Sequence, residues 1–293
     1  MSMLSIIVVE YFSRPHLDRL LDSVAMYEKE APVWVSSNSA YAQSDRLELC
    51  RRFPQAQFLF NEKNLGYAGG VNRALAQLMT PYAAILNPDV ELTEEIATRG
   101  LAPFSEDSRL AVVGPKVLDG SGEPSHTFRR FYTPSYVLAR YLCMSKTARF
   151  RRIRDYFLMA DASRDVFTYV DWVNGGSQFV RMDAYREVGG MDERYFLYME
   201  DMDWCRVFWR AGWRVAYWPG VSLVHPIKYD GTRRGVFGIM SKAARRQIWS
   251  YFKYLLKWEP AVSSPAAALQ AEVNARRSHL RGSATCAYPV RVC

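Results

Sequence analysis

Residues 82–90 read YAAILNPDV, a short apolar run that stops abruptly at Asn87, Pro88 and Asp89. Five such residues bounded by turn formers are typical of a buried β-strand, and proline ends strand pairing because it has no backbone N–H. The pattern predicts a strand over Tyr82–Leu86 that delivers Asp89 to one edge of a sheet. A carboxylate there can bind a hard divalent cation, but Asn-Pro-Asp is also common in ordinary turns.

Three further apolar runs precede this strand, and helical patterns separate them. The predicted strands are Leu4–Val9, Pro32–Ser37 and Ala56–Phe60, and the predicted helices follow Pro15 and cover Ser44–Phe53. Strands that alternate with helices predict an α/β fold with a mostly parallel central sheet and helices on both faces. Ligands of such sheets bind at the carboxyl ends of the strands. Ser37, Asn61 and Asn87–Asp89 are therefore expected to face one crevice.

The segment Asn64–Asn72, NLGYAGGVN, follows the third strand and opens a helix. Gly66, Gly69 and Gly70 allow close approach of a ligand to the backbone, and the start of a helix attracts phosphate. The spacing matches neither the dinucleotide fingerprint nor the phosphate loop that ends in Gly-Lys-Ser/Thr. Taken alone, the segment is equally well explained as an ordinary connection between a strand and a helix.

The segment Phe196–Arg206, FLYMEDMDWCR, places three acids among aromatic residues and methionines. On a helix, Glu200, Asp203 and Arg206 share one face, which predicts an ion pair between the last two. Asp201 points away from that face and has no partner in the sequence. Acids in a first helical turn also favour the helix dipole, which is a purely structural explanation. Burial among apolar neighbours would instead raise the pKa of Asp201 and suit it to act as a general base.

Two other places carry candidate chemistry. The sequence DWVNGGSQFVR contains Trp172 followed by Gly175 and Gly176, and a tryptophan beside glycines suits stacking on a sugar ring. A tight turn with a core tryptophan explains the same residues equally well. His225 ends the apolar run VSLVH, and a lone histidine is usually structural. It becomes a candidate ligand only where it lies near Asp89.

The net charge of +8 is concentrated in two segments that contain no acid. Residues 140–154 carry six lysines and arginines, and residues 233–258 carry seven, interleaved with aromatic residues. A basic aromatic helix over Phe237–Trp258 suits a packed helix with a solvated face, an interfacial helix on anionic lipid, or a nucleic-acid-binding surface. Because the feature occurs twice and no nucleic-acid-binding module accompanies it, a membrane surface is favoured.

Cysteine usage and hydropathy indicate the compartment. The five cysteines show neither metal-site nor redox spacing, which favours a reducing, cytoplasmic environment. The N-terminus lacks the basic region of a signal peptide, and no stretch reaches the ~18 apolar residues of a membrane-spanning helix. Membrane contact is therefore expected to be peripheral, on the inner face of the cytoplasmic membrane.

The order of these blocks carries a family resemblance that no single block carries. Over about Leu4–Trp258, the chain resembles family 2 glycosyltransferases through IIVV, VSSNS, NEKNLGYAGGVNRAL, ILNPDV, VDWVNGGSQFVR, VGGMDERYFLYMEDMDWCRVFWRAGW and VSLVH. It looks most similar to the bacterial dTDP-rhamnosyltransferases of O-antigen and related polysaccharide assembly. The resemblance implies a single nucleotide-sugar-binding domain of the GT-A type.

The resemblance also implies an inverting transfer of L-rhamnose from dTDP-L-rhamnose to a hydroxyl of a lipid-linked or saccharide acceptor in cell-surface polysaccharide synthesis. Asp201 matches the general base. Asp89 closes the motif that binds Mg²⁺ or Mn²⁺, and His225 matches a position that assists the metal or the diphosphate. The residues matched to the sugar donor are Ser37, Asn38, Asn64, Gly66, Gly70, Asn72, Asn87 and Asp89. The residues expected at the acceptor are Trp172, Gly175, Gly176 and Glu200.

Two departures from the family pattern lie in the nucleotide pocket. After the second strand the family has Val-Asp-Asn, where the Asp contacts the nucleobase, but Ser37 and Asn38 stand here. The first strand of the family runs into Thr/Ser-Tyr-Asn, whereas this chain has Glu10-Tyr11-Phe12. The alternatives are a transferase of another hexose and a non-catalytic protein that binds a nucleotide sugar or a membrane. Because Asp89 and Asp201 are retained, an active enzyme is favoured.

Three regions are expected along the chain. A glycosyltransferase domain covers residues 1–232, a basic aromatic helical extension that contacts the membrane covers residues 233–259, and a weakly ordered tail rich in Ala and Ser covers residues 260–293. The expected partners are a nucleotide-sugar donor, a lipid-linked glycan acceptor and an anionic membrane surface, and nucleic acid is not among them.

Overall fold

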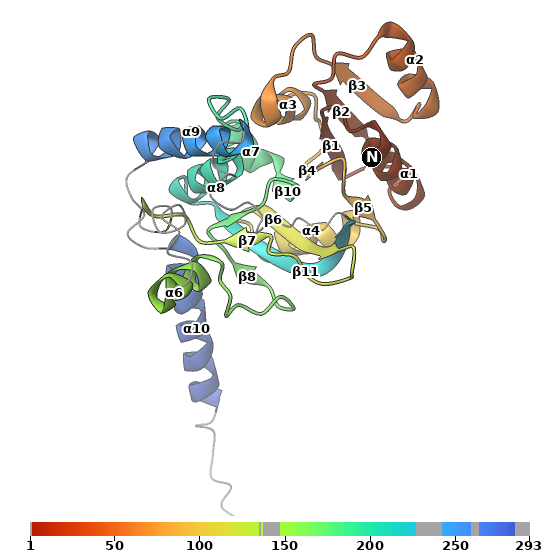
Figure 1. The fold of residues 1–293 in the computed structure, drawn as a ribbon. Coiled ribbons are helices and arrows are strands. Elements are labelled where there is room, and N and C mark those ends of the chain that lie inside the picture. Colours follow the sequence, from red (N-terminus) through yellow and green to blue (C-terminus); the bar gives the residue numbers. More distant parts are fainter. Residues whose placement is uncertain (1, 135, 137–146, 227–241, 259–263, 285–293) are drawn as a thin grey trace, which may run out of the picture.

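The computed structural model describes residues 2–134, 136, 147–226, 242–258 and 264–284. A central sheet orders its strands β3-β2-β1-β4-β10-β6-β11-β5, with β8 paired to β11 (Figure 1). The bounds are β1 Leu4–Glu10, β2 Val33–Ser37, β3 Ala56–Phe60, β4 Tyr82–Leu86, β5 Glu91–Leu92, β6 Leu110–Asp119, β8 Thr168–Tyr169, β10 Ser177–Arg181 and β11 Arg214–His225. A second sheet joins β7 Phe128–Arg129 to β9 Trp172–Val173.

The four N-terminal strands are parallel, as their alternation with helices predicts. β10 runs antiparallel between β4 and β6, and β11 pairs with β6 in parallel. The sequence predicts two strands, Arg214–Trp218 and Val221–His225, but they form the single strand β11, whose register shifts between Trp218 and Ser222. The mostly parallel α/β sheet confirms the predicted fold class. It gathers the carboxyl ends of β1, β2, β3 and β4 at one edge.

Helices cover both faces of the central sheet (Figure 1). The helices of the described residues are α1 Arg14–Tyr27, α2 Gln43–Arg52, α3 Gly66–Leu75, α4 Ala97–Glu106, α6 Ala148–Phe157, α7 Met182–Val188, α8 Glu200–Arg210, α9 Lys242–Lys257 and α10 Pro265–Ala284. Of these, α10 extends away from the central sheet (Figure 1). Strand β1 shows how the two layers are separated, because its side chains alternate. Ile6 and Val8 belong to the cluster beneath α1, whereas Ile7 and Val9 belong to the cluster beneath α3 and α8.

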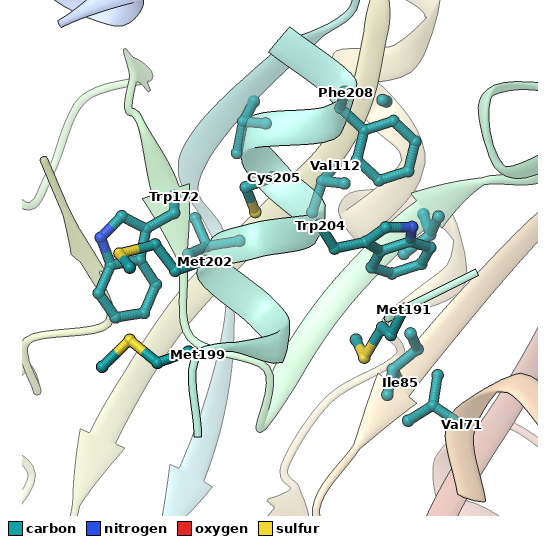
Figure 2. Close-up of a cluster of buried hydrophobic side chains, with 14 of the residues drawn as sticks. Val71, Ile85, Val112, Trp172, Met191, Met199, Met202, Trp204, Cys205 and Phe208 are labelled. Carbon is teal, nitrogen blue, oxygen red and sulfur yellow. The ribbon is translucent and has the colours of Figure 1, made fainter. Parts of the chain in front are cut away.

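The buried face of α8 accounts for the apolar residues around its acids. Met202, Trp204, Cys205 and Phe208 are fully buried in one cluster that also contains Val112 of β6 (Figure 2). Trp204 additionally donates its indole N–H to the carbonyl of Gly189 at 2.9 Å. This packing fixes α8 against the sheet, so the first turn of the helix is held at a defined position.

Part of the chain after Pro260 forms a helix, α10, over Pro265–Ala284. The weakly ordered tail expected over residues 260–293 stays a prediction. The buried carboxylate of Asp171 explains where the helix begins, because it accepts hydrogen bonds from the Ser264 hydroxyl at 2.5 Å and the Ala266 N–H at 3.2 Å. Such a carboxylate satisfies an orphan N–H of the first helical turn. The boundaries of the three predicted regions stay predictions.

The two basic segments are only partly within the described structure. Residues 140–146 and 233–241 lie outside it, and α6 and α9 represent the remainder. In the described ranges, no helix combines the length and the apolar character needed to cross a membrane.

Candidate active site

The ends of β4 and β11 bring Asp89 and His225 together. Strand β5 pairs antiparallel with β11, with Glu91 opposite Val224, so the Asn87–Asp89 turn lies against the end of β11. The Nε2 atom of His225 is 3.0 Å from Oδ2 of Asp89. Burial alone would raise the pKa of Asp89, but the hydrogen bond and charge of His225 lower it below the ordinary value. Asp89 is therefore held in its ionised form.

The second carboxylate oxygen of Asp89, Oδ1, is buried and has no hydrogen-bond partner. A buried oxygen without a partner is uncommon in folded proteins. Carboxylate oxygens are the ligands that Mg²⁺ and Mn²⁺ prefer, so Asp89 fits the expected divalent cation, whereas the His225 imidazole is a ligand typical of softer metals. Among the described residues, no cluster of three or more histidine, cysteine, aspartate or glutamate side chains could enclose a metal.

Asp201 lies at the start of α8, where its carboxylate accepts two backbone hydrogen bonds. Oδ2 accepts the Gly175 N–H at 3.0 Å, and Oδ1 accepts the Met202 N–H at 2.8 Å. Burial raises the pKa of Asp201, and the bonds from Gly175 and Met202 oppose that rise. Part of its surface remains exposed. Asp201 therefore has the raised pKa that a general base requires, and its role as the base stays a prediction.

Glu200 precedes Asp201 and is almost completely buried, with 5% of its surface exposed. Its Oε2 atom has no hydrogen-bond partner. Burial, and then the negative charge of Asp201, raise the pKa of Glu200 well above its ordinary value. Two adjacent carboxyls of raised pKa titrate as a coupled pair, so the pair is expected to hold one proton over the pH range between its two ionisation steps.

Asp203 does not pair with Arg206, so this prediction is wrong. In the described structure, the nearly buried carboxylate of Asp203 pairs instead with Lys257 of α9 at 2.7 Å. It also accepts the Trp258 indole N–H at 2.6 Å and the Tyr195 hydroxyl at 3.1 Å. Arg206 donates to the Tyr254 hydroxyl at 2.8 Å. The third acid of the cluster therefore fastens α9 to α8, and helical geometry within one segment could not reveal a partner 54 residues away.

The loop over Asn64–Asn72 is held by its own side chains. Oδ1 of Asn64 accepts the Gly66 N–H at 2.8 Å. Gly66 has φ +75°, and a methyl group there would lie 2.4 Å from the Phe196 carbonyl oxygen. A methyl group at Gly70 would lie 2.7 Å from a Val9 side-chain carbon. The two glycines are therefore required by close packing of this loop.

Asn72 performs a bracing role. Its amide donates to the Met191 carbonyl at 2.8 Å and to Glu193 at 3.0 Å, and its Oδ1 accepts the Met191 N–H at 2.8 Å. The side chain predicted to meet the sugar donor is thus committed to the segment that leads into α8. It ties α3 to that segment.

Ser37 and Asn38 lie at the expected strand edge, but their side chains are occupied. The buried Glu10 carboxylate accepts the Ser37 hydroxyl at 2.8 Å. Oδ1 of Asn38 accepts the Asn61 amide at 2.8 Å, and its amide donates to the Gly66 carbonyl at 2.9 Å. Ser37 and Asn61 are adjacent, because the Asn61 N–H donates to the Ser37 carbonyl at 2.9 Å, and these contacts are among the protein groups themselves. The expectation that they share one crevice with Asn87–Asp89 stays a prediction.

Glu10 also belongs to this network, although its sequence context predicts no partner for its carboxylate. Its carboxylate also accepts the hydroxyls of Ser39 at 2.9 Å and Tyr41 at 2.8 Å. Burial, with the neighbouring Glu10 carboxylate, raises the pKa of Tyr41 to about 12. An acid at the end of an otherwise apolar strand was the available signal.

The Asn174–Gly176 turn connects the segment that carries Asp201 to the segment that carries Asp89. The Gly175 N–H donates to the Asp201 carboxylate, while the Gly176 carbonyl accepts the Asn87 N–H at 2.9 Å. Trp172 does not project into this region. Its ring is 5% exposed, and its indole N–H donates to the Arg130 carbonyl at 3.0 Å. The structure therefore favours the alternative of a core tryptophan beside a tight turn over sugar stacking.

Known structures show that the chain has a fold of the GT-A type. The chain aligns with GalNAc-T7 crystallised with UDP, GalNAc and Mn²⁺ at a TM-score of 0.60 and 14% identity, covering 87% of this chain and 48% of that one. It aligns with the mannosyltransferase PcManGT of Pyrobaculum calidifontis, in complex with GDP-Man and Mn²⁺, at a TM-score of 0.54 and 15% identity, covering 93% and 79%.

Residues 5–164 match glycosyl transferase family 2, and the chain belongs to this family. It is a glycosyltransferase. The chain is 29% identical over 242 residues to the N-acetylglucosaminyl-diphospho-decaprenol L-rhamnosyltransferase of Mycobacterium tuberculosis, which covers 76% of this chain and 75% of that protein. It is 24% identical over 267 residues to the rhamnosyltransferase WbbL of Escherichia coli, covering 87% and 93%.

Proposed function

We propose that the protein transfers L-rhamnose from dTDP-L-rhamnose, with inversion, to a hydroxyl of a lipid-linked or saccharide acceptor in bacterial cell-surface polysaccharide synthesis. Two relatives that align over three quarters or more of this chain are rhamnosyltransferases, and one carries a diphospho-lipid acceptor in its name. The observation that carries the proposal is the Asp201 carboxylate. It has a raised pKa, belongs to a partly exposed residue and is joined through the Asn174–Gly176 turn to Asn87, two residues before Asp89.

The proposed role of Asp201 is to accept the proton of the attacking hydroxyl. Its two backbone hydrogen bonds orient the carboxylate, and burial keeps the carboxylate basic. Glu200 lies beside it as the proposed acceptor contact. Gly175 and Gly176 are the other proposed neighbours of the acceptor, and their lack of side chains lets Asp201 and Asn87 pack closely against this turn.

Asp89 and His225 are the proposed holders of Mg²⁺ or Mn²⁺. When bound, a divalent cation neutralises charge on the leaving diphosphate. Asn87 and the start of α3 are the proposed neighbours of the diphosphate, because the first N–H groups of a helix attract anions. Asn64, Gly66, Gly70 and Asn72 serve the sugar donor by holding this loop in place.

A peripheral position on an anionic membrane, at the inner face of the cytoplasmic membrane, is the second part of the proposal. One face of α9 carries four exposed apolar residues at helical spacing, namely Ile248, Trp249, Phe252 and Leu256. The exposed cation Arg245 shares this face, and Lys253 lies beside the Trp249 ring. An amphipathic helix of this composition binds the headgroup region of anionic bilayers. Such a surface would hold the enzyme near a lipid-linked acceptor.

Sugar transfer by the purified protein tests the function. The assay uses dTDP-L-rhamnose with Mn²⁺ or Mg²⁺ and a synthetic diphospholipid-linked N-acetylglucosamine. Asp201→Asn is expected to retain sugar-donor binding and to reduce kcat at least 100-fold, because the base is lost. Asp183→Asn, an exposed acid of α7, is the matched control. Wild-type turnover by Asp201→Asn would disprove the assignment of the base.

A thermal-shift series separates sugar-donor identity from metal binding. A ligand that binds the folded state raises Tm according to its affinity, so dTDP-L-rhamnose is compared with other nucleotide sugars, with and without Mn²⁺. Asp89→Asn is expected to abolish the additional shift that Mn²⁺ produces. A larger shift with another nucleotide hexose would replace rhamnose in the proposal. Binding without transfer to any acceptor would favour a non-catalytic protein.

A further inference from the structure

Tyr67 lies between the sugar-donor loop and the two segments that hold the base. It is the second residue of α3, within the loop Asn64–Asn72, and is half-buried. Its backbone N–H donates to the Phe196 carbonyl at 3.0 Å. Its hydroxyl donates to the Gly175 carbonyl at 2.5 Å. One residue of the loop therefore contacts the chain leading into α8 and also the glycine turn.

Gly175 is held from both sides by these contacts. Its carbonyl accepts the Tyr67 hydroxyl, while its N–H donates to Oδ2 of Asp201 at 3.0 Å. A methyl group at Gly175 would lie 3.2 Å from Cβ of Asp201 and 3.3 Å from Cε1 of Tyr67. The three residues are therefore in direct contact, and a shift of the tyrosine must move the glycine or leave its carbonyl without this donor.

The surroundings of Tyr67 keep its hydroxyl protonated. Burial, followed by the charges of Glu200, Asp201 and Asp89, raises the pKa of Tyr67 well above its ordinary value. The hydroxyl consequently remains a hydrogen-bond donor throughout the pH range in which a carboxylate base operates. It is directed to a neutral carbonyl, so the proton is not shared with the base itself.

We infer that Tyr67 is a positioning residue, which orients the Asp201 carboxylate by fixing Gly175 and ties that orientation to the sugar-donor loop. The inference rests on the proposed role of Asp201 as the base. It gives the loop a second task, because the residues that surround the sugar donor also fix the hydrogen bond that aims the base. Small displacements of a reacting group reduce turnover strongly, which makes such a support necessary.

Tyr67→Phe removes the hydroxyl and keeps the ring. Its matched control is Tyr217→Phe, because the Tyr217 hydroxyl likewise donates to a main-chain carbonyl, that of Arg164 at 2.8 Å, away from the site. With dTDP-L-rhamnose and Mn²⁺, Tyr67→Phe is expected to lower kcat about 10-fold and to leave the KM for the sugar donor within about 2-fold. Tyr217→Phe is expected to keep the wild-type kcat.

The pH profile separates positioning from a loss of folded protein. The charged and titratable groups that act on Asp201 are Glu200 and Cys205 of α8, Tyr67 of α3 and Arg129 of β7. The Gly175 N–H lowers the pKa of Asp201, so weakening that bond raises it. The acid limb of kcat is therefore expected to move to higher pH in Tyr67→Phe. A fall in kcat that follows the folded fraction, with the acid limb unmoved, overturns the inference.

Hydrogen exchange of the Gly175 amide provides a readout that needs no substrate. NMR of the free protein is expected to show faster exchange at Gly175 in Tyr67→Phe than in the wild type or in Tyr217→Phe. Unchanged exchange overturns the inference even if transfer assays show no activity. Turnover by Asp201→Asn refutes the base itself, whereas an inactive Asp201→Asn with a fully active Tyr67→Phe refutes only the positioning role.

Discussion

Asp203 of α8 and Lys257 of α9 form an ion pair with an Nζ–Oδ2 distance of 2.7 Å, in which the acid is 1% exposed and the lysine 23%. The helix that carries the proposed base is thereby fastened to the helix that carries the exposed aromatic face. Lys257 also contacts Asp192 at 2.9 Å, so the same cation holds the segment before α8. Lys257 therefore belongs to the packing of the enzyme rather than to a lipid-facing surface.

Removing this cation is expected to destabilise the fold. Lys257→Met leaves the Asp203 carboxylate buried without its cation, which lowers the free energy of unfolding by about 2 kcal/mol because the lysine is partly solvated. Urea denaturation measures this. Lys116→Met is the control, since its partner Asp165 is 78% exposed and such surface pairs contribute below about 1 kcal/mol. Equal losses in the two variants would contradict the structural role of Asp203.

Gly66→Ala tests the packing of the sugar-donor loop. The added methyl group meets the Phe196 carbonyl oxygen and the backbone has φ +75°, so we expect a loss of about 3 kcal/mol and weaker binding of the nucleotide sugar. Gly122→Ala is matched in backbone conformation, with φ +83°, but has no atom within 4 Å of the new methyl group. Its expected loss is about 1 kcal/mol. A similar loss of unfolding free energy at both positions would show that the backbone conformation alone determines the cost, without a contribution from the Phe196 contact.

Glu200→Gln is expected to make the protein more stable than the wild type, by a margin that grows as the pH rises. A buried carboxyl whose pKa is raised contributes fully to stability below its ordinary pKa of 4.5, and that contribution is lost as pH rises through the raised value. Glutamine stays neutral. The Tm of the variant should therefore exceed that of the wild type at about pH 8 and approach it near about pH 4. Scanning calorimetry across this range measures the difference, with the exposed Glu62→Gln as control.

The exposed face of α9 is expected to bind anionic vesicles. Replacing Trp249, Phe252 and Leu256 with serine should reduce partitioning onto phosphatidylglycerol vesicles at least 10-fold, because these apolar side chains no longer enter the headgroup region. Three exposed apolar residues elsewhere, Met26, Leu47 and Met79, provide a matched serine triple as the control. Sedimentation with vesicles measures the bound fraction. Partitioning that is equal in the two triple variants would reject α9 as the membrane surface.

The features that follow from chain order could be predicted from the sequence. Parallel strands place their carboxyl ends at one edge of the sheet, so the position of Asp89 at that edge could be predicted. In the structure, strand β11 brings His225 beside Asp89. The raised pKa of Asp201 could also be predicted, because its apolar neighbours lie within one helical turn.

Contacts between distant segments could not be predicted. Asn72 lies beside the sugar-donor loop in sequence but bonds to Met191, 119 residues away. Asp203 finds Lys257 instead of the nearer Arg206, and Ser264 finds Asp171. Each choice depends on which helix packs over which, and local periodicity does not report it. The same limit hid Tyr67, whose hydroxyl reaches a glycine 108 residues later.

The buried carboxylate of Glu10 also limits which residues position 37 can hold. Glu10 and Ser37 are direct neighbours across β1 and β2, and the serine hydroxyl donates to the acid. An aspartate at position 37 would set two carboxylates against each other in a buried place, where like charges repel. A carboxylate at either of these two positions is therefore favourable only while the other position holds a neutral residue.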